Sequence, residues 1–236
     1  MDKSVFETAN YKVLNRPCGP LQTNCYIVVN KENKDSLVVD PGVNAADWVM
    51  SQVRKPLAIL NPHGHYDHVW SNARLKEEWP QVPVVCPYED AFLVEKDQFM
   101  QGQPPCKVDI LVGAPEGAQV KTFQSTTENL GRRTVLQWGS LVTEFICYPG
   151  HTPGTSVIIL WHQSRPEERV MFSGDFIFYR AIGRSDFEFS SAAVMKSSLE
   201  AVLKLDEKNM PVFPGHDGFT RFADEQALIP RWIQTL

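Results

Sequence analysis

His63-Gly64-His65-Tyr66-Asp67-His68 holds three of the six histidines of the chain within six positions. The segment closely follows the apolar run at residues 57–60, which is typical of a buried strand. In a turn after such a strand, His63 and His65 can point the same way, while Asp67 and His68 face a second point nearby. Imidazole and carboxylate groups suit zinc, iron and manganese. The segment therefore predicts a metal site at the end of a strand.

Three other side chains that can bind metals also follow apolar runs. His151 lies in Tyr148-Pro149-Gly150-His151-Thr152-Pro153-Gly154, Asp175 ends Ser173-Gly174-Asp175, and His216 ends Pro214-Gly215-His216. Because each follows residues typical of a strand, we expect each to project from a sheet edge. The glycines and prolines beside His151 and His216 fix the turns that aim these side chains. His162 stands outside this pattern, and we expect it at the surface, at a strand end.

The rest of the chain alternates β-branched runs with helical spacing. We expect strands at residues 26–29, 36–39, 57–60, 82–86, 141–148, 156–160, 170–172 and 212–213. We expect one helix with Asn44 as its N-cap, one over residues 69–78, and one of roughly 15 residues that starts at Ser190 or Ser191. Strands with intervening helices in both halves predict a layered α/β protein. Residues 97–133 follow no pattern, and a loop of this length is usually functional or poorly ordered.

The composition narrows the class of protein. The 236 residues are 43% hydrophobic and 22% charged, as in ordinary globular proteins, and the net charge of −5 disfavours a protein that wraps nucleic acid. No apolar run approaches the roughly 18 residues of a membrane span, and residues 1–13 lack the pattern of a signal peptide. The five scattered cysteines are typical of reduced thiols in a cytoplasmic protein. Cys106, in a polar, proline-rich stretch, is the candidate for a reactive thiol.

The series of motifs resembles that of a known family. The order His-x-His-x-Asp-His, Gly-His-Thr-Pro-Gly, Ser-Gly-Asp and Pro-Gly-His is similar to that of the metallo-β-lactamase superfamily, from Asp40-Pro41-Gly42 to His216. The resemblance implies a single domain over residues 1–236 with a four-layer αβ/βα sandwich. It also implies that the metals lie at one edge of two facing β-sheets.

The resemblance further implies two divalent metal ions, with zinc favoured and iron or manganese as alternatives. His63, His65 and His151 would hold the first metal, and Asp67, His68 and His216 the second. Asp175 would bridge the two. Two such cations lower the pKa of a shared water to near neutrality and clamp the attacking and leaving oxygens. The bridging hydroxide would be the nucleophile, and Asp67 would orient it besides serving as a ligand.

Within the superfamily, the chain resembles the glyoxalase II-like branch. It shares the Leu21-Gln22-Thr23-Asn24-Cys25-Tyr26 segment and the Asp40-Pro41-Gly42 turn. The clinically important lactamases lack the bridging aspartate, so Asp175 disfavours β-lactam hydrolysis as the main activity. The RNA-processing branch adds large domains and basic surface, which this acidic chain does not match. True glyoxalase II adds a C-terminal helical domain that binds glutathione, and we expect the 20 residues after His216 to leave no room for it.

Two function classes fit these residues. The first is a dinuclear hydrolase of thioesters or related esters that acts on a small molecule, without a nucleic acid or a membrane as partner. The second is a mononuclear non-haem iron persulfide dioxygenase, in which the resemblance implies that His63, His151 and Asp175 hold the iron. We favour the hydrolase. Two metals per chain would support hydrolysis, whereas one iron with oxygen uptake would support the dioxygenase.

Residues just after Asp175 are the candidates for substrate contacts. Tyr179 and Arg180 follow the bridging position closely, and Arg184 lies in Gly183-Arg184-Ser185-Asp186. Arg184 has an alternative role, a structural pair with Asp186. Nothing in the sequence indicates an oligomeric state.

Overall fold

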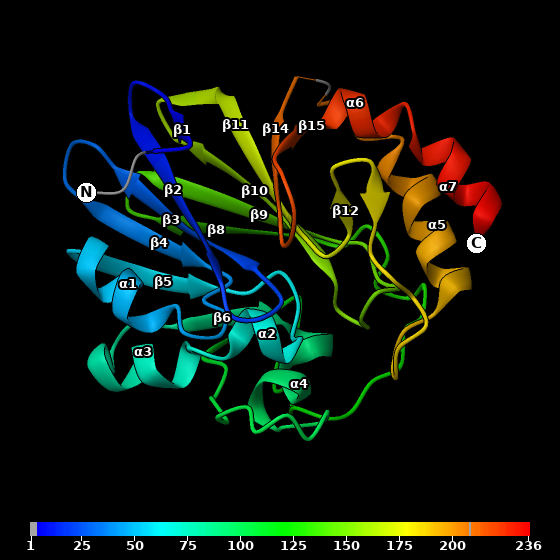
Figure 1. Ribbon diagram of the computed structural model, residues 1–236, viewed down its shortest axis with the longest axis horizontal. Helices are drawn as coiled ribbons and strands as arrows, with labels where there is room; N and C mark the ends of the chain where they lie inside the picture. Colours follow the sequence, from blue (N-terminus) through cyan, green and yellow to red (C-terminus); the bar gives the residue numbers. More distant parts are fainter. Residues whose placement is uncertain (1–3, 208) are drawn as a thin grey trace.

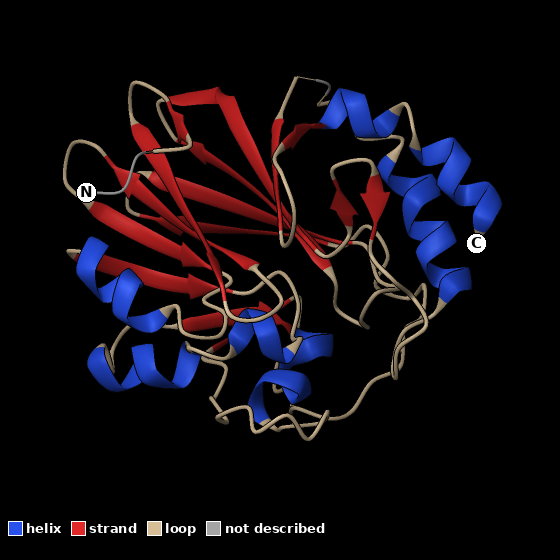
Figure 2. Cartoon of the chain, viewed as in Figure 1, coloured by secondary structure: helices blue, strands red, loops and turns tan. Residues whose placement is uncertain are grey.

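Two β-sheets face each other, and each carries helices on its outer side (Figures 1 and 2). The computed structural model describes residues 4–207 and 209–236. The first sheet has the strand order β1-β2-β3-β4-β5-β6-β7, and the second has the order β15-β14-β11-β10-β9-β8. Among the described residues, strands β12 and β13 pair separately as a small hairpin.

The strands of the first sheet are β1 (Phe6–Glu7), β2 (Tyr11–Cys18), β3 (Thr23–Asn30), β4 (Asp35–Val39), β5 (Lys55–Leu60), β6 (Val84–Pro87) and β7 (Ile110–Val112). Those of the second sheet are β8 (Arg133–Trp138), β9 (Leu141–Cys147), β10 (Ser156–His162), β11 (Arg165–Gly174), β14 (Pro211–Pro214) and β15 (Thr220–Arg221). The hairpin consists of β12 (Ile177–Phe178) and β13 (Ala181–Ile182). The helices are α1 (Ala46–Gln52), α2 (Tyr66–Val69), α3 (Asn72–Glu78), α4 (Ala91–Glu95), α5 (Ala192–Val202), α6 (Phe222–Gln226) and α7 (Ile229–Thr235), with a 3₁₀ turn at Tyr88–Asp90.

Three hydrophobic cores separate four layers. Trp48 of α1 and Leu75 of α3 belong to the core on the outer face of the first sheet. The core between the sheets contains Tyr26 and Phe172, whose ring centroids are 5.2 Å apart. Leu199 of α5 belongs to a third core, which covers the outer face of the second sheet. This arrangement confirms the predicted four-layer αβ/βα sandwich.

Parallel pairing brings the ends of several strands to one edge. Strand β4 pairs parallel with β5, β5 with β6, and β6 with β7, with helices in the connections. In the second sheet, β11 pairs parallel with β14. Because parallel strands end at the same edge of a sheet, the loops after β5, β11 and β14 can meet there. The histidines and aspartates of the predicted metal site lie in these loops and in the loop after β9.

Several predicted helices differ in detail from the observed ones. The helix predicted over residues 69–78 is split into α2 and α3, because the Ser71 backbone N–H donates to the Pro41 carbonyl over 2.9 Å instead of to a helical carbonyl. Asn44 is not the cap of α1: it has a φ of 64°, and Ala45 is the N-cap, without a side-chain hydrogen bond. Ser191 is the N-cap of α5, as one of the two predicted alternatives, and its hydroxyl accepts a hydrogen bond from the Val194 N–H.

No helix in the described ranges is long and apolar enough to span a bilayer.

Candidate metal centre

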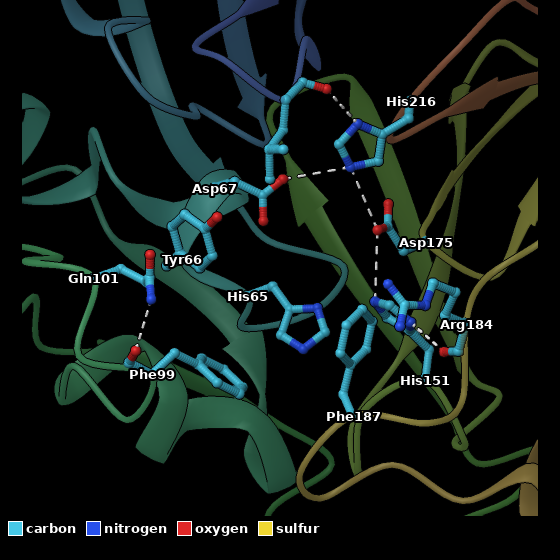
Figure 3. Close-up of a pocket in the computed structure, with 11 residues that line it drawn as sticks. His65, Tyr66, Asp67, Phe99, Gln101, His151, Asp175, Arg184, Phe187 and His216 are labelled. Atoms are coloured by element: carbon cyan, nitrogen blue, oxygen red, sulfur yellow. Dashed lines mark hydrogen bonds and ion pairs between the residues drawn. The ribbon is translucent and has the colours of Figure 1, made fainter.

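Four loops at one edge of the sandwich bring the seven predicted ligands together. The loop after β5 carries His63 and His65, helix α2, which follows directly, carries Asp67 and His68, and the turn after β9 carries His151. Asp175 follows β11 directly, and His216 follows β14. Six of the seven are at least 92% buried, and His216 is half-buried. Figure 3 shows five of these side chains converging on the floor of a pocket.

The seven side chains form two groups that share one carboxylate. The nitrogens and oxygens of the first group, His63, His65, His151 and Asp175, lie within 4.8 Å of one another, as do those of the second group, Asp67, His68 and His216. Asp175 faces both groups. Its Oδ2 is 3.5 Å from His151 Nε2, and its Oδ1 is 3.3 Å from His68 Nε2. This is the position that a bridging carboxylate requires.

Buried atoms without hydrogen bonds indicate that the first group suits a metal ion. His63 Nδ1 and Nε2, His151 Nε2 and Asp175 Oδ1 are buried and make no hydrogen bond in the structure. Unpartnered buried polar atoms are unfavourable and rare in folded proteins. Imidazole nitrogens and carboxylate oxygens are the donor set of zinc, iron and manganese sites. The residues present therefore fit a divalent metal.

In three histidines, an oxygen atom lies beside Nδ1, the ring nitrogen that faces away from the cluster. His151 Nδ1 donates to the Arg184 carbonyl over 2.7 Å, and His216 Nδ1 donates to the Leu21 carbonyl over 3.1 Å. His68 Nδ1 lies 3.3 Å from Asp40 Oδ2. An acceptor at Nδ1 places the proton there and leaves the Nε2 lone pair to the metal. All three rings are thus oriented as ligands.

The charges of the cluster depend on its carboxylates. Burial alone would lower the pKa values of His68 and His216, but the carboxylates of Asp67 and Asp175 raise both, that of His216 to about 9. Burial lowers the pKa of His65 to about 3. Without a metal, the imidazoles of His68 and His216 are therefore protonated at neutral pH, and their positive charges offset the carboxylates of Asp67 and Asp175. The first group holds neutral imidazoles, which can bind a metal directly.

Asp67 is held by a threonine from the first sheet. The Thr23 hydroxyl donates to Asp67 Oδ2 over 2.7 Å, and the same oxygen lies 3.3 Å from His216 Nε2. Thr23 is fully buried at the start of β3. The hydroxyl therefore fixes the orientation of the carboxylate that carries the predicted catalytic role.

The loop of His216 is anchored to the first sheet. The Asn24 N–H donates to the Gly215 carbonyl over 2.7 Å, and the Tyr26 hydroxyl donates to the Pro214 carbonyl over 2.6 Å. Asn24 and Tyr26 lie in β3, in the segment that resembles the glyoxalase II-like branch. Their role is to position the last ligand.

Asp90 is a functional residue that the sequence analysis missed. It is fully buried, and its Oδ2 accepts hydrogen bonds from the Gly64 N–H over 2.9 Å and from the Thr152 hydroxyl over 2.5 Å. Its Oδ1 accepts from the Gly154 N–H over 2.5 Å. One carboxylate thereby joins the loop of His63 and His65 to the turn of His151. Only the tertiary contacts distinguish it from the other acidic residues of the chain.

Two adjoining cavities open above the metal-binding side chains. The first, of about 430 Å³, is also lined by Tyr66, Phe99 and Gln101, and the second, of about 360 Å³, by Phe178 and Ile182. Phe99 and Gln101 come from the stretch of residues 97–133 that follows no pattern in the sequence. Leu21, Arg184 and Phe187 line both cavities, in addition to side chains of the metal-binding cluster.

Of the three predicted substrate residues, the structure places only Arg184 in the lining. Its Nε and Nη2 each bond to a carboxylate oxygen of Asp186 over 2.9 Å, so the alternative pairing is also present. Tyr179 and Arg180 line neither cavity, contrary to expectation. They form the tip of the β12–β13 hairpin, where Arg180 has a φ of 55° and Tyr179 is 50% exposed. The Arg180 backbone N–H donates to the Glu225 carboxylate over 2.9 Å, which holds this turn against β15 and α6.

The prediction of His162 at the surface is wrong, and the alternative of a reactive thiol at Cys106 is disfavoured. His162 is 93% buried rather than at the surface, because β10 continues through it and pairs it with Leu141. It lies outside the metal-binding groups, and its Nδ1 is 2.8 Å from the Ser164 hydroxyl. Cys106 is buried, and burial raises the pKa of its thiol to about 11, which opposes reactivity.

The family model of the metallo-β-lactamase superfamily matches residues 18–216, which contain all seven metal-binding side chains. The chain belongs to this superfamily. An uncharacterized protein of Mycobacterium leprae is 31% identical to it over 225 residues, 91% of this chain and 95% of the relative. Hydroxyacylglutathione hydrolase GloC of Haemophilus influenzae is 27% identical over 223 residues, 91% of this chain and 94% of the relative.

Solved structures share the metallo-β-lactamase fold. BLEG-1 B3 metallo-β-lactamase is similar with a TM-score of 0.71 and 25% identity, over 93% of this chain and 98% of that one. TTHA1623, solved in a di-iron-bound form, is similar with a TM-score of 0.65 and 26% identity, over 90% of this chain and 96% of that one.

A glycine next to the last ligand explains part of the motif shared with the superfamily. A Cβ atom on Gly215 would clash with Asp175 Oδ1 and would lie 2.6 Å from His68 Cε1. The backbone of the His216 loop therefore touches the metal-binding atoms themselves. In this metallo-β-lactamase-superfamily chain, glycine is needed at position 215 to leave room for the cluster.

Proposed function

We propose that the chain is a dinuclear metal-dependent hydrolase of thioesters or related esters. The observation that carries this proposal is the meeting of two metal-binding groups at Asp175. Its Oδ2 lies 3.5 Å from His151 Nε2 of the first group, and its Oδ1 lies 3.3 Å from His68 Nε2 of the second. Its Oδ2 also lies 3.4 Å from His216 Nε2 of the second group. A hydroxyacylglutathione hydrolase among the relatives supports the thioester class. We expect the substrate to be a small molecule, because the cavities above the cluster are of small-molecule size.

Two divalent cations, zinc in the first place and iron or manganese as alternatives, fit the nitrogen and oxygen donors. His63, His65 and His151 would hold one, Asp67, His68 and His216 the other, and Asp175 both. A di-iron form of a similar protein supports iron as an alternative. When bound, such a pair of cations supplies an activated water and stabilises negative charge on an oxygen of the substrate.

The residues of the chain divide the remaining work. In hydrolysis, a C–O bond forms at the thioester carbonyl, the C–S bond breaks, and the thiolate takes up a proton. Asp67 lies at the floor of the cavity, where its carboxylate can accept a hydrogen bond from the attacking water and orient it. Thr23 holds Asp67 for this role. Asp90 holds the loops of His65 and His151 at a fixed separation.

Glutathione carriers are expected to be poor substrates. Arg184 is the cation that both cavities share, and its Nε and Nη2 are already bonded to Asp186. Remote contacts to a thiol carrier supply the binding energy that raises efficiency. We therefore expect slow hydrolysis of lactoylglutathione, mainly through weak binding.

The five buried free cysteines support a reducing compartment such as the cytoplasm.

The test is metal content together with turnover. The protein would be loaded with zinc, manganese or iron, its metal-to-protein ratio measured, and a panel of thioesters including lactoylglutathione assayed. We expect two metals per chain and hydrolysis of at least one thioester. One iron per chain with oxygen uptake on a persulfide would contradict the proposal and favour the dioxygenase. Efficient lactoylglutathione hydrolysis, with a kcat/KM of about 10⁷–10⁸ M⁻¹s⁻¹, would overturn the expected weakness toward glutathione.

A further inference from the structure

Phenylalanine rings surround the metal-binding histidines on the side of the cavities. Phe99 and Phe187 stand edge-on to His65 at ring-centroid distances of 5.3 and 5.6 Å, and Figure 3 shows them on two sides of that ring. Phe178 stands edge-on to His216 at 6.0 Å. The polar cluster thus lies below an apolar rim formed by Phe99, Phe178 and Phe187. An apolar pocket with a few convergent polar groups is typical of a small-molecule site.

Some apolar side chains around the cavities are exposed to solvent. Leu21 is 52% exposed and Phe187 is 38% exposed, and both line the two cavities. Met100, 89% exposed, lies between the lining residues Phe99 and Gln101 in the sequence. Exposed apolar side chains gathered around a concave site mark a surface that contacts a ligand. The ligand part that covers them must itself be apolar.

The two cavities differ in their outer walls. The first adds the polar side chains of Tyr66 and Gln101 beside the ring of Phe99. The second adds Phe178 and Ile182, which are both apolar. Because the two cavities share His151, Asp175 and His216, a thioester whose carbonyl lies at these residues can extend its acyl group into one cavity and its thiol into the other. The second cavity suits an apolar acyl group, and the first suits a more polar thiol.

The charges of the lining point the same way. Arg184 is the only lysine or arginine that lines the described cavities. Its guanidinium is bonded to Asp186 through two nitrogens and lies 4.4 Å from the centre of the Phe187 ring. Its charge is therefore matched before any substrate arrives. Because Asp186 balances the charge of Arg184, the exposed pair offers an anionic acyl group no net positive charge.

Resting on the proposed hydrolase function, we propose that the natural substrate carries an uncharged apolar acyl group, which occupies the cavity lined by Leu21, Phe178, Ile182 and Phe187. Specificity then comes from the apolar wall, and the metals act on the carbonyl alone.

The experiment compares thioesters of one uncharged thiol, N-acetylcysteamine, in the metal-loaded protein. The acyl groups are acetyl, butanoyl, hexanoyl and succinyl, the last being an anionic counterpart of butanoyl. We expect kcat/KM to rise by at least about tenfold from acetyl to hexanoyl, since each buried methylene favours the transition state. We expect succinyl to be slower than butanoyl. A flat series, or faster succinyl hydrolysis, would overturn the proposal.

A matched pair of variants locates the effect. Ile182→Thr removes an apolar group from the cavity wall, and we expect it to lower kcat/KM about tenfold more for hexanoyl than for acetyl. Ile233→Thr is the control, because Ile233 is partly buried at the edge of the same core and lines neither cavity. It should leave the hexanoyl-to-acetyl ratio unchanged. Equal effects of the two variants on that ratio would contradict the assignment of this cavity.

Binding of the acid products separates this proposal from the hydrolase function. Calorimetry with hexanoate and succinate on the metal-loaded protein needs no turnover. Tighter binding of hexanoate supports the apolar site even if no thioester is hydrolysed, a result that would overturn the hydrolase function alone. Tighter binding of succinate would overturn the apolar site. Hydrolysis without chain-length preference would leave the hydrolase function standing and refute the acyl specificity.

Discussion

The hydroxyl of Thr152 donates a hydrogen bond to Asp90 Oδ2 over 2.5 Å, although the two residues are 62 positions apart in the chain. The same oxygen accepts from the Gly64 N–H, and the other accepts from the Gly154 N–H. Both oxygens of Asp90 thus receive donors from two loops that carry metal-binding histidines. The separation of these loops is set by a residue outside both metal-binding groups.

Asp90→Asn should destabilise the protein and weaken the first metal group. An amide has one oxygen, so its NH₂ group must face either the Gly154 N–H or the Gly64 N–H and Thr152 hydroxyl. Leaving buried donors unpaired costs about 1–3 kcal/mol of the free energy of unfolding. Urea unfolding of the metal-free protein measures this loss, and a metal titration measures the affinity. Asp47→Asn, at an exposed position, is the control; an equal effect of the two variants would refute the role of Asp90.

Asp175→Ala should reduce metal stoichiometry as well as turnover, because this carboxylate faces both groups. The readout is metal content after dialysis. His162→Ala is the comparison, since it removes a buried imidazole outside the metal-binding groups. It should lower stability and leave the number of bound metals unchanged. Loss of metal on replacing His162, or full metal content without Asp175, would show that the ligand assignment is mistaken.

Gly215→Ala should weaken the second metal group. The new methyl group would press on Asp175 Oδ1 and His68, so either the carboxylate or the loop must move. Gly218→Ala, in the same loop, provides a control, because a Cβ there has no neighbour within 4 Å. Isothermal titration with zinc compares the two variants. Unchanged affinity in Gly215→Ala would mean that the loop relaxes without disturbing the cluster.

Metal binding to the second group should depend on pH. The pKa of His216 is raised to about 9 without a metal, so its imidazole is protonated at pH 7 and must lose a proton to bind. Each displaced proton raises the apparent affinity by about tenfold per pH unit, up to the pKa of the histidine. Affinity should therefore rise steeply from pH 7 to pH 9, because His68, whose pKa is also raised, must lose its proton as well. An affinity that is flat over this range would show that His216 binds the metal from a neutral state.

Cys106 should react slowly with thiol reagents in the folded protein. Burial raises the pKa of this thiol to about 11, so the thiolate is scarce at pH 8. Alkylation with iodoacetamide, followed by mass spectrometry, should label it far faster after unfolding than before. Rapid labelling of Cys106 in the native protein would restore it as a reactive thiol.

The metal ligands could be predicted from the sequence because their signals are local. A histidine or aspartate that follows an apolar strand, between glycines and prolines, indicates its place at a sheet edge without knowledge of the partners. Asp90 has no such signal. Its three hydrogen bonds join loops that meet only in the folded protein. The place of Phe99 in the cavity lining could not be predicted either, because it lies in a stretch without hydrophobic periodicity.

Strands β2 and β8 were also missed, for a related reason. Strand β8 alternates exposed and half-buried residues, and β2 contains Arg16 and Pro17. Such strands are held by pairing with β9 and β3 rather than by apolar runs of their own. His162 shows the opposite error. The strand was expected to end at Leu160, but pairing with β9 extends β10 to His162 and buries this side chain.

The anchoring of the His216 loop to β3 has a consequence for the order in which the site is assembled. His63, His65, His151 and Asp175 precede the last third of the second sheet in the chain, whereas His216 becomes a ligand only after β14 has docked beside β11 and against Asn24 and Tyr26. During synthesis, the first metal group is complete as soon as Asp175 has joined the folded part. The second must wait for contacts that span nearly the whole chain, since Leu21 and His216 are 195 positions apart. A chain that binds metal in both groups has therefore completed the folding of both sheets.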